Sequence, residues 1–598
     1  MKRTNQEPQS TWRAGKSWRG EEGMALLITM LALFMIALTG MVIARIAATE
    51  IELTGHYRSA SQAFFAADGG AEYGLNELLT MGRSMSSHPT SGDLSSITVP
   101  PLSDSNFTTF TIVPTGALTL APLTSGYFQG LTASTQDYLV MATAETVAVP
   151  IGTSTVTMKA AFDIIPIFQF AIFYEEDLEL LPGPNMWLSG RVHSNQSIYI
   201  DCGNTLTVDA VMTAAGDIFN FRKNNGGTSA GDVEIRDSNG NFQGMSGLDS
   251  SSPTWHDDAL DRWHGNVRSS DHGIERLNMT IDDPTNPRMI IEPGLSTDTQ
   301  AQQDGKMYYE ADLRIINGKA YNNNGNIVSV IDPNTGTSAI EQTDFWDPRE
   351  QRFILATKID MAKLGRSPGW PNNGIIYAGG FMPGVDFADW DNPPPWSGGG
   401  YTPPWSNGGQ LSHFGIMLHN GSELAAAATV VSANPIYLQG NYNNVNKVGA
   451  AVIADAITIL SNRWGDVNGD GDTTDGGDGD LAYSQLSMNG RNAWSTTVNA
   501  ALMLGNTDTV PGVVYNGGVE NVLRFIERWS GDTLTYLGSI VDLWNSEIAV
   551  GAWGYGNPIY TAPIRNWGFD TDFLDPANLP PGTPNVYMIR VLGWDRSQ

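Results

Sequence analysis

The chain has 598 residues, a length that allows two to four domains or one long all-β or solenoid unit. Its 63 Asp and Glu against 33 Lys and Arg give a formal net charge of −30 at pH 7, which argues against a nucleic-acid partner and suits an extracellular, cation-containing setting. The only cysteine, Cys202, excludes an intramolecular disulfide, and we expect it to be a small buried apolar residue.

The N-terminal segment joins a basic leader to a long uncharged run. The basic residues of the leader are Lys2, Arg3, Arg13, Lys16 and Arg19. Residues 24–44 carry no charge, and as a helix they would span about 30 Å, which is enough to cross a bilayer. A secretory signal peptide would have a shorter apolar region and a small-x-small cleavage site at its far end. The basic leader should stay on the cytoplasmic side, which places the rest of the chain outside.

The helical pattern continues past the apolar run. No proline occurs between Pro8 and Pro89, and apolar residues recur among polar ones as far as Leu78, as they do in an amphipathic helix. We therefore predict one helix over residues 24–83, with a membrane-spanning half followed by an amphipathic half. Residues 84–106 are rich in Ser and Pro and are predicted to link this helix to the body.

Two features of this segment are similar to those of a known family. The basic leader ends in Gly23 just before the apolar helix, and residues 59–78 read SASQAFFAADGGAEYGLNEL. Together they resemble the N-terminal region of PilX-type minor pilins, within the class of type IV pilins and pseudopilins. The resemblance implies that a prepilin peptidase removes residues 1–23 by cutting between Gly23 and Met24. An uncleaved single-span anchor is the alternative.

The resemblance also gives a meaning to Ile28. Most major pilins carry Glu at this position, where it neutralises the N-terminal amine of a neighbouring subunit inside an apolar fibre core. PilX-like subunits lack that Glu, which suits the end of a fibre better than its shaft. The implied partners are the inner membrane, other minor pilins, the pilus assembly machinery and the prepilin peptidase. The implied location is the inner membrane, with the body in the periplasm, and then the pilus or cell surface.

The chain after the linker has the composition of a β protein. Alternating Thr and Val predict a small antiparallel sheet over residues 107–168. Residues 169–598 are rich in Gly and Asn, and strands such as AAVIADAITIL at 450–460 have adjacent apolar residues that indicate burial on both faces. We predict a mainly β fold with a long N-terminal α-helix, in which the large domain is a parallel β-helix or a set of stacked sheets. No fixed sequence period is detectable.

Several phrases of this large domain, among them DFWDPREQRF and NPIYLQGNYN, resemble the C-terminal region of long PilX-like pilus-assembly proteins. The resemblance implies a large exported domain carried on a pilin stem. Within it, residues 519–529 read VENVLRFIERW, which predicts a helix with an apolar face and a Glu520–Arg524 pair one turn apart. We expect this helix to pack against a sheet.

Residues 465–480, GDVNGDGDTTDGGDGD, are the strongest candidate for a binding site. Positions 1, 3, 5 and 7 of a calcium loop are occupied by Asp466, Asn468, Asp470 and Asp472. This alternation is typical of the start of an EF-hand-like or dockerin-like loop, and Gly471 at position 6 permits the sharp turn. Position 12 is Gly477, so we predict that Asp475 supplies the closing carboxylate. We therefore predict bound Ca²⁺, with a solvated acidic loop as the alternative.

Other clusters point less clearly to chemistry. Residues 255–277 are rich in His and Asp, but without an H-E-x-x-H motif or a defined zinc spacing we predict a short helix there and no catalytic zinc. The acid pairs Glu175–Glu176 and Asp347–Glu350 could serve glycoside hydrolysis, although such pairs are common in so acidic a chain.

Residues 382–409 are rich in Pro, Gly and Trp and are predicted to be a loop, in which Trp390, Trp396 and Trp405 either contact a surface or glycan or pack on one another.

The sequence as a whole predicts a non-enzymatic, minor pilin-like subunit for type IV pilus assembly. We expect it at or near the fibre tip, with a calcium-binding extracellular domain for priming or adhesion. The alternative is a membrane-tethered, polysaccharide-active enzyme of the β-helix type. Pilus and secretion pseudopilus are not distinguished, because both use the same N-terminal segment.

Overall fold

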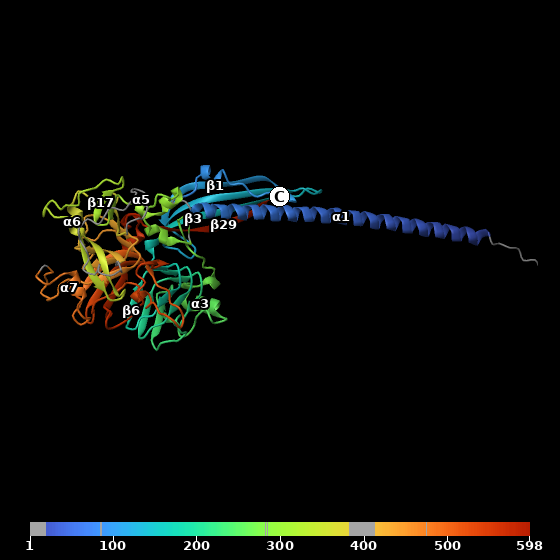
Figure 1. Cartoon of the computed structure of the whole chain (residues 1–598). Coiled ribbons are helices and arrows are strands. Elements are labelled where there is room, and N and C mark those ends of the chain that lie inside the picture. The colour runs from blue at the N-terminus through green and yellow to red at the C-terminus, as the bar shows by residue number, and fades with distance from the viewer. Residues whose placement is uncertain are drawn as a thin grey trace, which may run out of the picture.

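The chain folds into a long helical stem that carries a large β-rich head (Figure 1). The computed structural model describes residues 19–83, 87–281, 283, 285–381, 413–473 and 475–597. The stem is helix α1 (Arg19–Arg83), which runs unbroken for 65 residues and confirms the predicted continuous helix. Its C-terminal part lies along a small sheet, and its N-terminal part projects away from the head (Figure 1).

The small sheet beside the stem is antiparallel, as predicted. Its strands in spatial order are β1 (Ser105–Pro122), β2 (Thr132–Thr146), β3 (Thr153–Pro166), β29 (Asn585–Ser597) and β15 (Asn278–Met279). All neighbouring strands run antiparallel. Along β2 every second residue is buried, because successive side chains of a strand point to opposite faces. Strand β29 joins from the far end of the chain, so the last part of the head is tied to the sheet that carries the stem.

The first part of the large domain is a parallel β-solenoid. Its strands are β4 (Ile172–Tyr174), β5 (Leu178–Leu180), β6 (Met186–Ser189), β7 (Val192–Ser194), β8 (Ile198–Ile200), β9 (Thr205–Asp209), β10 (Met212–Ala214), β11 (Ile218–Phe219), β12 (Asp232–Arg236), β13 (Phe242–Gly244) and β14 (Val267–Arg268). Corresponding strands of successive coils pair in parallel, as β4–β7–β10–β14, β5–β8–β11 and β6–β9–β12.

The first coils of this solenoid are 20 residues apart, a spacing that is not detectable as a period in the sequence. Val192 pairs with Ile172 on one side and with Met212 on the other, whereas the next pairing in the same stack joins Met212 to Val267. All four side chains are buried in the solenoid interior. The spacing is hard to detect in the sequence because each coil repeats only an inward-facing position, which any large apolar residue can fill.

The second part stacks on the first through one shared central sheet. Its strands in that sheet are β16 (Leu313–Ile316), β17 (Lys319–Asn322), β20 (Ile375–Gly379), β22 (Ala428–Ser432), β24 (Ala450–Ala454), β26 (Thr496–Asn506), β27 (Thr533–Asn545) and β28 (Ile564–Phe569). A second sheet holds β18 (Ile340–Asp347), β19 (Arg352–Asp360), β21 (His413–His419), β23 (Ile436–Gln439) and β25 (Ile457–Leu460). Strand β27 pairs in parallel with β4 and thereby joins the two parts. Every residue of β22 and β24 is buried, which confirms the prediction of burial on both faces.

The remaining helices are short and lie on the head. They are α2 (Ser91–Leu94), α3 (Trp255–Trp263), α4 (Gln300–Gly305), α5 (Met307–Glu310), α6 (Met361–Arg366) and α7 (Asp480–Ser484). The helix predicted at 519–529 is wrong, because only Val519–Asn521 form a single 3-10 turn. The N–H of Arg524 donates to the carbonyl of Ile457 at 2.9 Å, so the segment pairs beside β25. Tertiary β-pairing has overridden the local helical preference.

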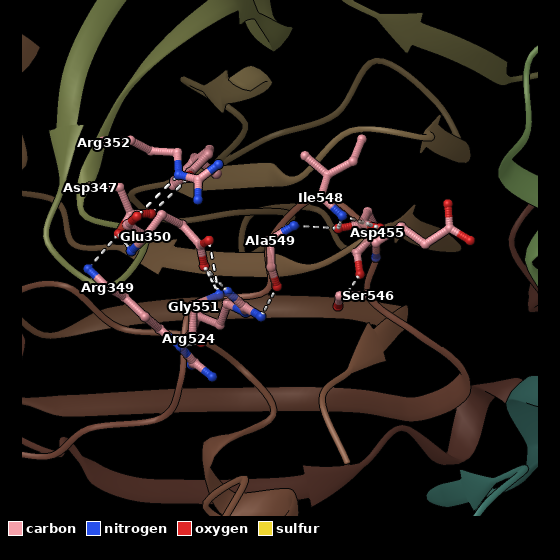
Figure 2. A network of polar contacts seen from close by, with 12 residues as sticks. Asp347, Arg349, Glu350, Arg352, Asp455, Arg524, Ser546, Ile548, Ala549 and Gly551 are labelled. Atoms are coloured by element: carbon pink, nitrogen blue, oxygen red, sulfur yellow. Dashed lines mark hydrogen bonds and ion pairs between the residues drawn. The ribbon is translucent and has the colours of Figure 1, made fainter. Parts of the chain in front are cut away.

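A buried carboxylate fixes the segment that follows β27 (Figure 2). Asp455, between β24 and β25, accepts hydrogen bonds from the N–H groups of Glu547 at 2.8 Å and Ala549 at 2.9 Å. It also accepts from the N–H of Ile548 and forms an ion pair with Arg288 at 3.2 Å. Backbone N–H groups in a buried turn need such partners, so Asp455 holds two distant parts of the solenoid in register.

Candidate functional site: the exposed stem and the acidic loop

Residues 24–44 of α1 are uncharged on every side of the helix and exposed to solvent. Residues 23–54 are all exposed, and this stretch includes Gly23, Met24 and Ile28, of which Ile28 is 62% exposed. Among the described residues, the helix Gly23–Gly82 is the one that is long and apolar enough to span a membrane. A helix that is apolar all round is not stable alone in water, so it needs a lipid or protein environment.

The C-terminal part of α1 is sealed onto the small sheet by a row of small residues. Ala67 is fully buried, and Gly70 and Gly74 follow on the same helix face at spacings of three and four. A Cβ on Gly70 would lie 2.4 Å from Cε1 of Phe107, and a Cβ on Gly74 would lie 2.7 Å from Cγ1 of Val140. The motif at 59–78 is therefore rich in Ala and Gly because the helix backbone lies directly on the sheet.

The sequence analysis did not predict this packing role, although small residues at helical spacing are a signal for it.

Polar and aromatic residues of the same motif contact strand β29. Nε1 of Trp594 donates to Oδ1 of Asp68 at 3.1 Å, and the Arg596 guanidinium lies 4.3 Å from the ring centroid of Phe64. The stem, the small sheet and the last strand of the head therefore form one connected unit.

The acidic loop lies between β25 and α7, and its first predicted ligand has a defined geometry. Asp466 is buried, and its carboxylate accepts hydrogen bonds from the N–H groups of Gly469 and Gly471, the latter at 3.0 Å. This contact closes the sharp turn at Gly471, where the backbone φ of +94° favours glycine. The predicted role of Gly471 in the turn is thus confirmed.

The other predicted ligands lie near one another in the same loop. The side-chain amide of Asn468 donates to Asp470 at 3.1 Å and to Asp475 at 3.4 Å. The charges of Asp470 and Asp472 raise the pKa of Asp475, because a second and third carboxylate close by disfavour its ionised form. The loop therefore concentrates negative charge on the predicted residues. Within the described part of the chain, no three His, Cys, Asp or Glu side chains are gathered as a metal-binding group.

Two further aspartates anchor the end of the loop. Asp478 accepts from the N–H of Val467 at 2.9 Å, and Asp480 accepts from the Thr343 hydroxyl at 2.7 Å and from Lys358 at 2.8 Å. One oxygen of each, Oδ2 of Asp478 and Oδ1 of Asp480, is buried with no hydrogen-bond partner. The anchoring of Asp480 could not be predicted from the loop, because its partners Thr343 and Lys358 are more than a hundred residues away in the chain.

One acid of each pair considered for glycoside hydrolysis forms an ion pair with an arginine. Glu175 pairs with Arg276, and with the exposed Glu176 it lines a cleft of about 660 Å³. Asp347 and Glu350 are buried beneath the surface in an arginine-rich network (Figure 2). Neither arrangement presents two free carboxylates across an open cleft, as a glycosidase needs.

The other predicted sites divide between confirmed features and residues outside the description. Residues 255–263 form the predicted short helix α3, and Cys202 is buried as expected. His256 and His272 stack at 5.0 Å between ring centroids, and His272 bonds to backbone and to Ser269, as structural histidines do. The tryptophans of the Pro- and Gly-rich loop, which are Trp390, Trp396 and Trp405, lie outside the described residues.

Two buried acids in the segment between β26 and β27 make the stability of the fold depend on pH. Glu527 accepts hydrogen bonds from Ser461 and from Tyr483 of α7, and burial raises its pKa to about 7. Burial raises the pKa of Glu520 to about 7 as well. A carboxyl with a raised pKa in the folded state stabilises the fold below its unfolded pKa, and that contribution is lost as the pH rises through 7.

We therefore expect the stability of the protein to fall between pH 5 and pH 8, by up to about 1.4 kcal/mol per pH unit for each such group. Thermal unfolding of the full chain in detergent across this range measures the slope. Glu527→Gln should flatten the slope, whereas Glu341→Gln at an exposed position should leave it unchanged. An identical slope in all three proteins would contradict the assignment.

Comparison with known proteins finds likeness among solved structures but none in sequence. No family model and no curated protein sequence matches the chain. Among solved structures, the competence-associated pilin ComZ from Thermus thermophilus is similar at 11% sequence identity, with a TM-score of 0.23. The likeness covers 90% of this chain and 97% of that one. At this identity and score, it does not define the fold or the function of this chain.

Proposed function

We propose that this chain is a minor pilin-like subunit that enters a type IV pilus or a related pseudopilus at or near its tip. The proposal rests on the difference between the N-terminal and C-terminal parts of helix α1. Residues 24–44 are uncharged on every side of the helix and exposed, while the C-terminal part is sealed onto an antiparallel sheet by small residues. Such a stem can be held in a membrane and then transferred into an apolar fibre core while the head stays in water.

The apolar Ile28 supports a place at the fibre end. A subunit inside the shaft needs a carboxylate near this depth to neutralise the N-terminal amine of its neighbour, since an unpaired buried charge is costly. A subunit at the end has no neighbour ahead of it. The large solenoid head also suits an end position, because it extends well beyond the width of the stem (Figure 1). Display of this head would serve priming of the fibre or adhesion.

The test is the N-terminal sequence of the mature protein in sheared fibres, read by mass spectrometry. We expect a start at Met24 in that fraction. Gly23→Phe should leave the leader attached and keep the protein in the membrane, whereas Gly40→Ala should be processed normally. At both glycines no heavy atom lies within 4 Å of the position of a Cβ, so neither change disturbs the fold. An intact leader on wild-type protein, found only in the membrane, would contradict the proposal.

We also propose that the acidic loop binds Ca²⁺ in the extracellular medium. Asp466, Asn468, Asp470 and Asp472 would hold the ion, with Asp475 closing the site. Support comes from the like charges that raise the pKa of Asp475, and from the partnerless buried oxygens of Asp478 and Asp480 at the end of the loop. An ion would neutralise this cluster and stiffen the connection to α7.

Removal of calcium should therefore lower the melting temperature of the full chain by several degrees. Melting curves with excess EGTA and with millimolar CaCl₂ measure the effect. Asp470→Asn together with Asp472→Asn should abolish the difference, whereas Asp257→Asn with Asp258→Asn on the exposed face of α3 should preserve it. Equal melting temperatures for the wild type in both buffers would contradict the calcium proposal and leave the pilin proposal standing.

A further inference from the structure

The turn that joins β2 to β3 presents large apolar side chains to solvent. Residues 147–151 read Val-Ala-Val-Pro-Ile, and Val147, Val149 and Ile151 are all exposed, Val149 by 90%. Hairpin turns are usually built from Gly, Asn, Asp and Ser, because these residues adopt turn geometry and bond to water. A contiguous group of exposed apolar residues on a turn is therefore a mark of an interaction surface.

The turn is fixed in place on the stem. Cδ of Pro150 lies 3.4 Å from the position that a Cβ on Gly55 would take, and a Cβ on Gly152 would lie 2.4 Å from the backbone of Ser59. The N–H of Gly152 donates to Oγ1 of Thr146 at 2.9 Å, which closes the loop on itself. The apolar side chains thus point outward from an ordered turn that rests directly on α1.

The apolar surface of the turn continues onto the stem. On α1, Ile51 precedes Gly55 by one helical turn, on the side of the helix that contacts the hairpin turn, and it is exposed as well. This part of α1 is interrupted by charged residues and begins beyond the uncharged run that ends at Ala44. At 1.5 Å per residue, Gly55 lies about 16 Å further along the helix than Ala44, which places the turn outside the hydrocarbon core of a bilayer. Acyl chains are therefore not the partner of this surface.

We propose that Val147, Val149 and Ile151, together with the adjacent exposed face of α1, form a docking surface for the apolar stem helix of the neighbouring fibre subunit. This inference rests on the proposed function. The occupant follows from continuity, because the surface extends the exposed face of α1 that must itself be covered once the stem leaves the membrane. A second stem running beside α1 would cover both at once.

The test is the amount of subunit recovered in sheared fibres relative to the membrane fraction of the same cells. Val149→Glu should lower this ratio at least tenfold, and the milder Val149→Ser should lower it less. The matched control is Val513→Glu on the solenoid, where the side chain is 82% exposed. It should leave the ratio unchanged. All variants should melt at the wild-type temperature, since neither valine contributes a buried side chain.

Each outcome decides the proposal. Wild-type recovery of Val149→Glu in fibres would overturn the docking surface and leave the minor pilin proposal intact. An equal loss with Val513→Glu would show a general effect of added charge and would also overturn it. A fall of Val149→Glu in the membrane fraction itself would assign the turn to a lipid surface instead. Wild-type protein absent from fibres would overturn both proposals.

Discussion

Gly70→Leu is expected to loosen the stem from the head, whereas Gly69→Leu at the adjacent residue is expected to do no harm. A Cβ on Gly70 would lie 2.4 Å from Phe107 and 3.1 Å from Cβ of Ala142, so a leucine there overpacks the seam and costs about 2–3 kcal/mol. At Gly69 nothing lies within 4 Å. There the substitution gains helix propensity of about 0.8 kcal/mol.

Hydrogen exchange of α1 peptides from residues 60–83, in the detergent-solubilised full chain, measures the effect. Loss of 2–3 kcal/mol of local stability corresponds to roughly 30- to 150-fold faster exchange in Gly70→Leu. Exchange in Gly69→Leu should be equal to the wild type or slower. Equal acceleration in both variants would mean that the seam does not depend on close approach of the backbone at Gly70.

Local pattern was enough to predict the stem and the strand-rich head. The helix over 24–83 follows from an uninterrupted apolar run and the absence of proline, both of which act within a few residues. The antiparallel sheet and the buried parallel strands follow from alternating and continuous apolar runs. These features depend on backbone preference and side-chain burial near each residue, which the sequence states directly.

The features that were missed depend on residues far apart in the chain. Arg524 was predicted to lie in a helix. In the structure its backbone N–H instead donates to the carbonyl of Ile457 in the neighbouring strand, so β-pairing replaces the helix. The 20-residue spacing of the first coils was not predicted. Ile172, Val192 and Met212 occupy equivalent positions in successive coils but are different amino acids. Strand pairing between distant segments is set by the whole fold, so it leaves little trace in a local window.

The candidate sites show the same division. Asp466 and Gly471 lie in one sharp turn, as their spacing predicts, because a turn is set by residues close together in the chain. The calcium-binding role of this loop stays a prediction. The anchoring of Asp480 by Lys358 was not predictable, since the two residues are 122 positions apart. The small residues around Gly70 could have been read as a packing face from their spacing alone. The meaning of Gly23 and Ile28 came from resemblance, and their role stays a prediction.

The second large effect is expected at the buried ion pair of Glu350 and Arg524 (Figure 2). Their side chains approach to 2.5 Å at exposures of 2% and 4%, and Glu350 also accepts from the N–H of Gly551 at 2.9 Å. Burial raises the pKa of Glu350, and the Arg524 charge opposes that rise. Arg524→Met removes the opposing charge and leaves a buried carboxylate uncompensated, which should cost about 3–5 kcal/mol at pH 8.

A second substitution separates loss of the pair from loss of packing. Glu350→Gln with Arg524→Met removes the stranded charge but keeps an acceptor for Gly551, so we expect it to recover part of the stability. Lowering the pH should have a similar effect on Arg524→Met alone, because protonation of Glu350 removes the same charge. The defect should therefore shrink between pH 8 and pH 5, by up to about 1.4 kcal/mol per pH unit.

Denaturant unfolding of the full chain at both pH values measures these differences. Lys159→Met is the matched control, because it breaks a surface pair with Asp137 in which Lys159 is 50% exposed and should cost less than about 1 kcal/mol. If Arg524→Met lowered the free energy of unfolding by no more than Lys159→Met, the Glu350–Arg524 pair would contribute no more to stability than a surface ion pair. If its defect were the same at pH 5 and pH 8, packing of the arginine would be the cause and not its charge.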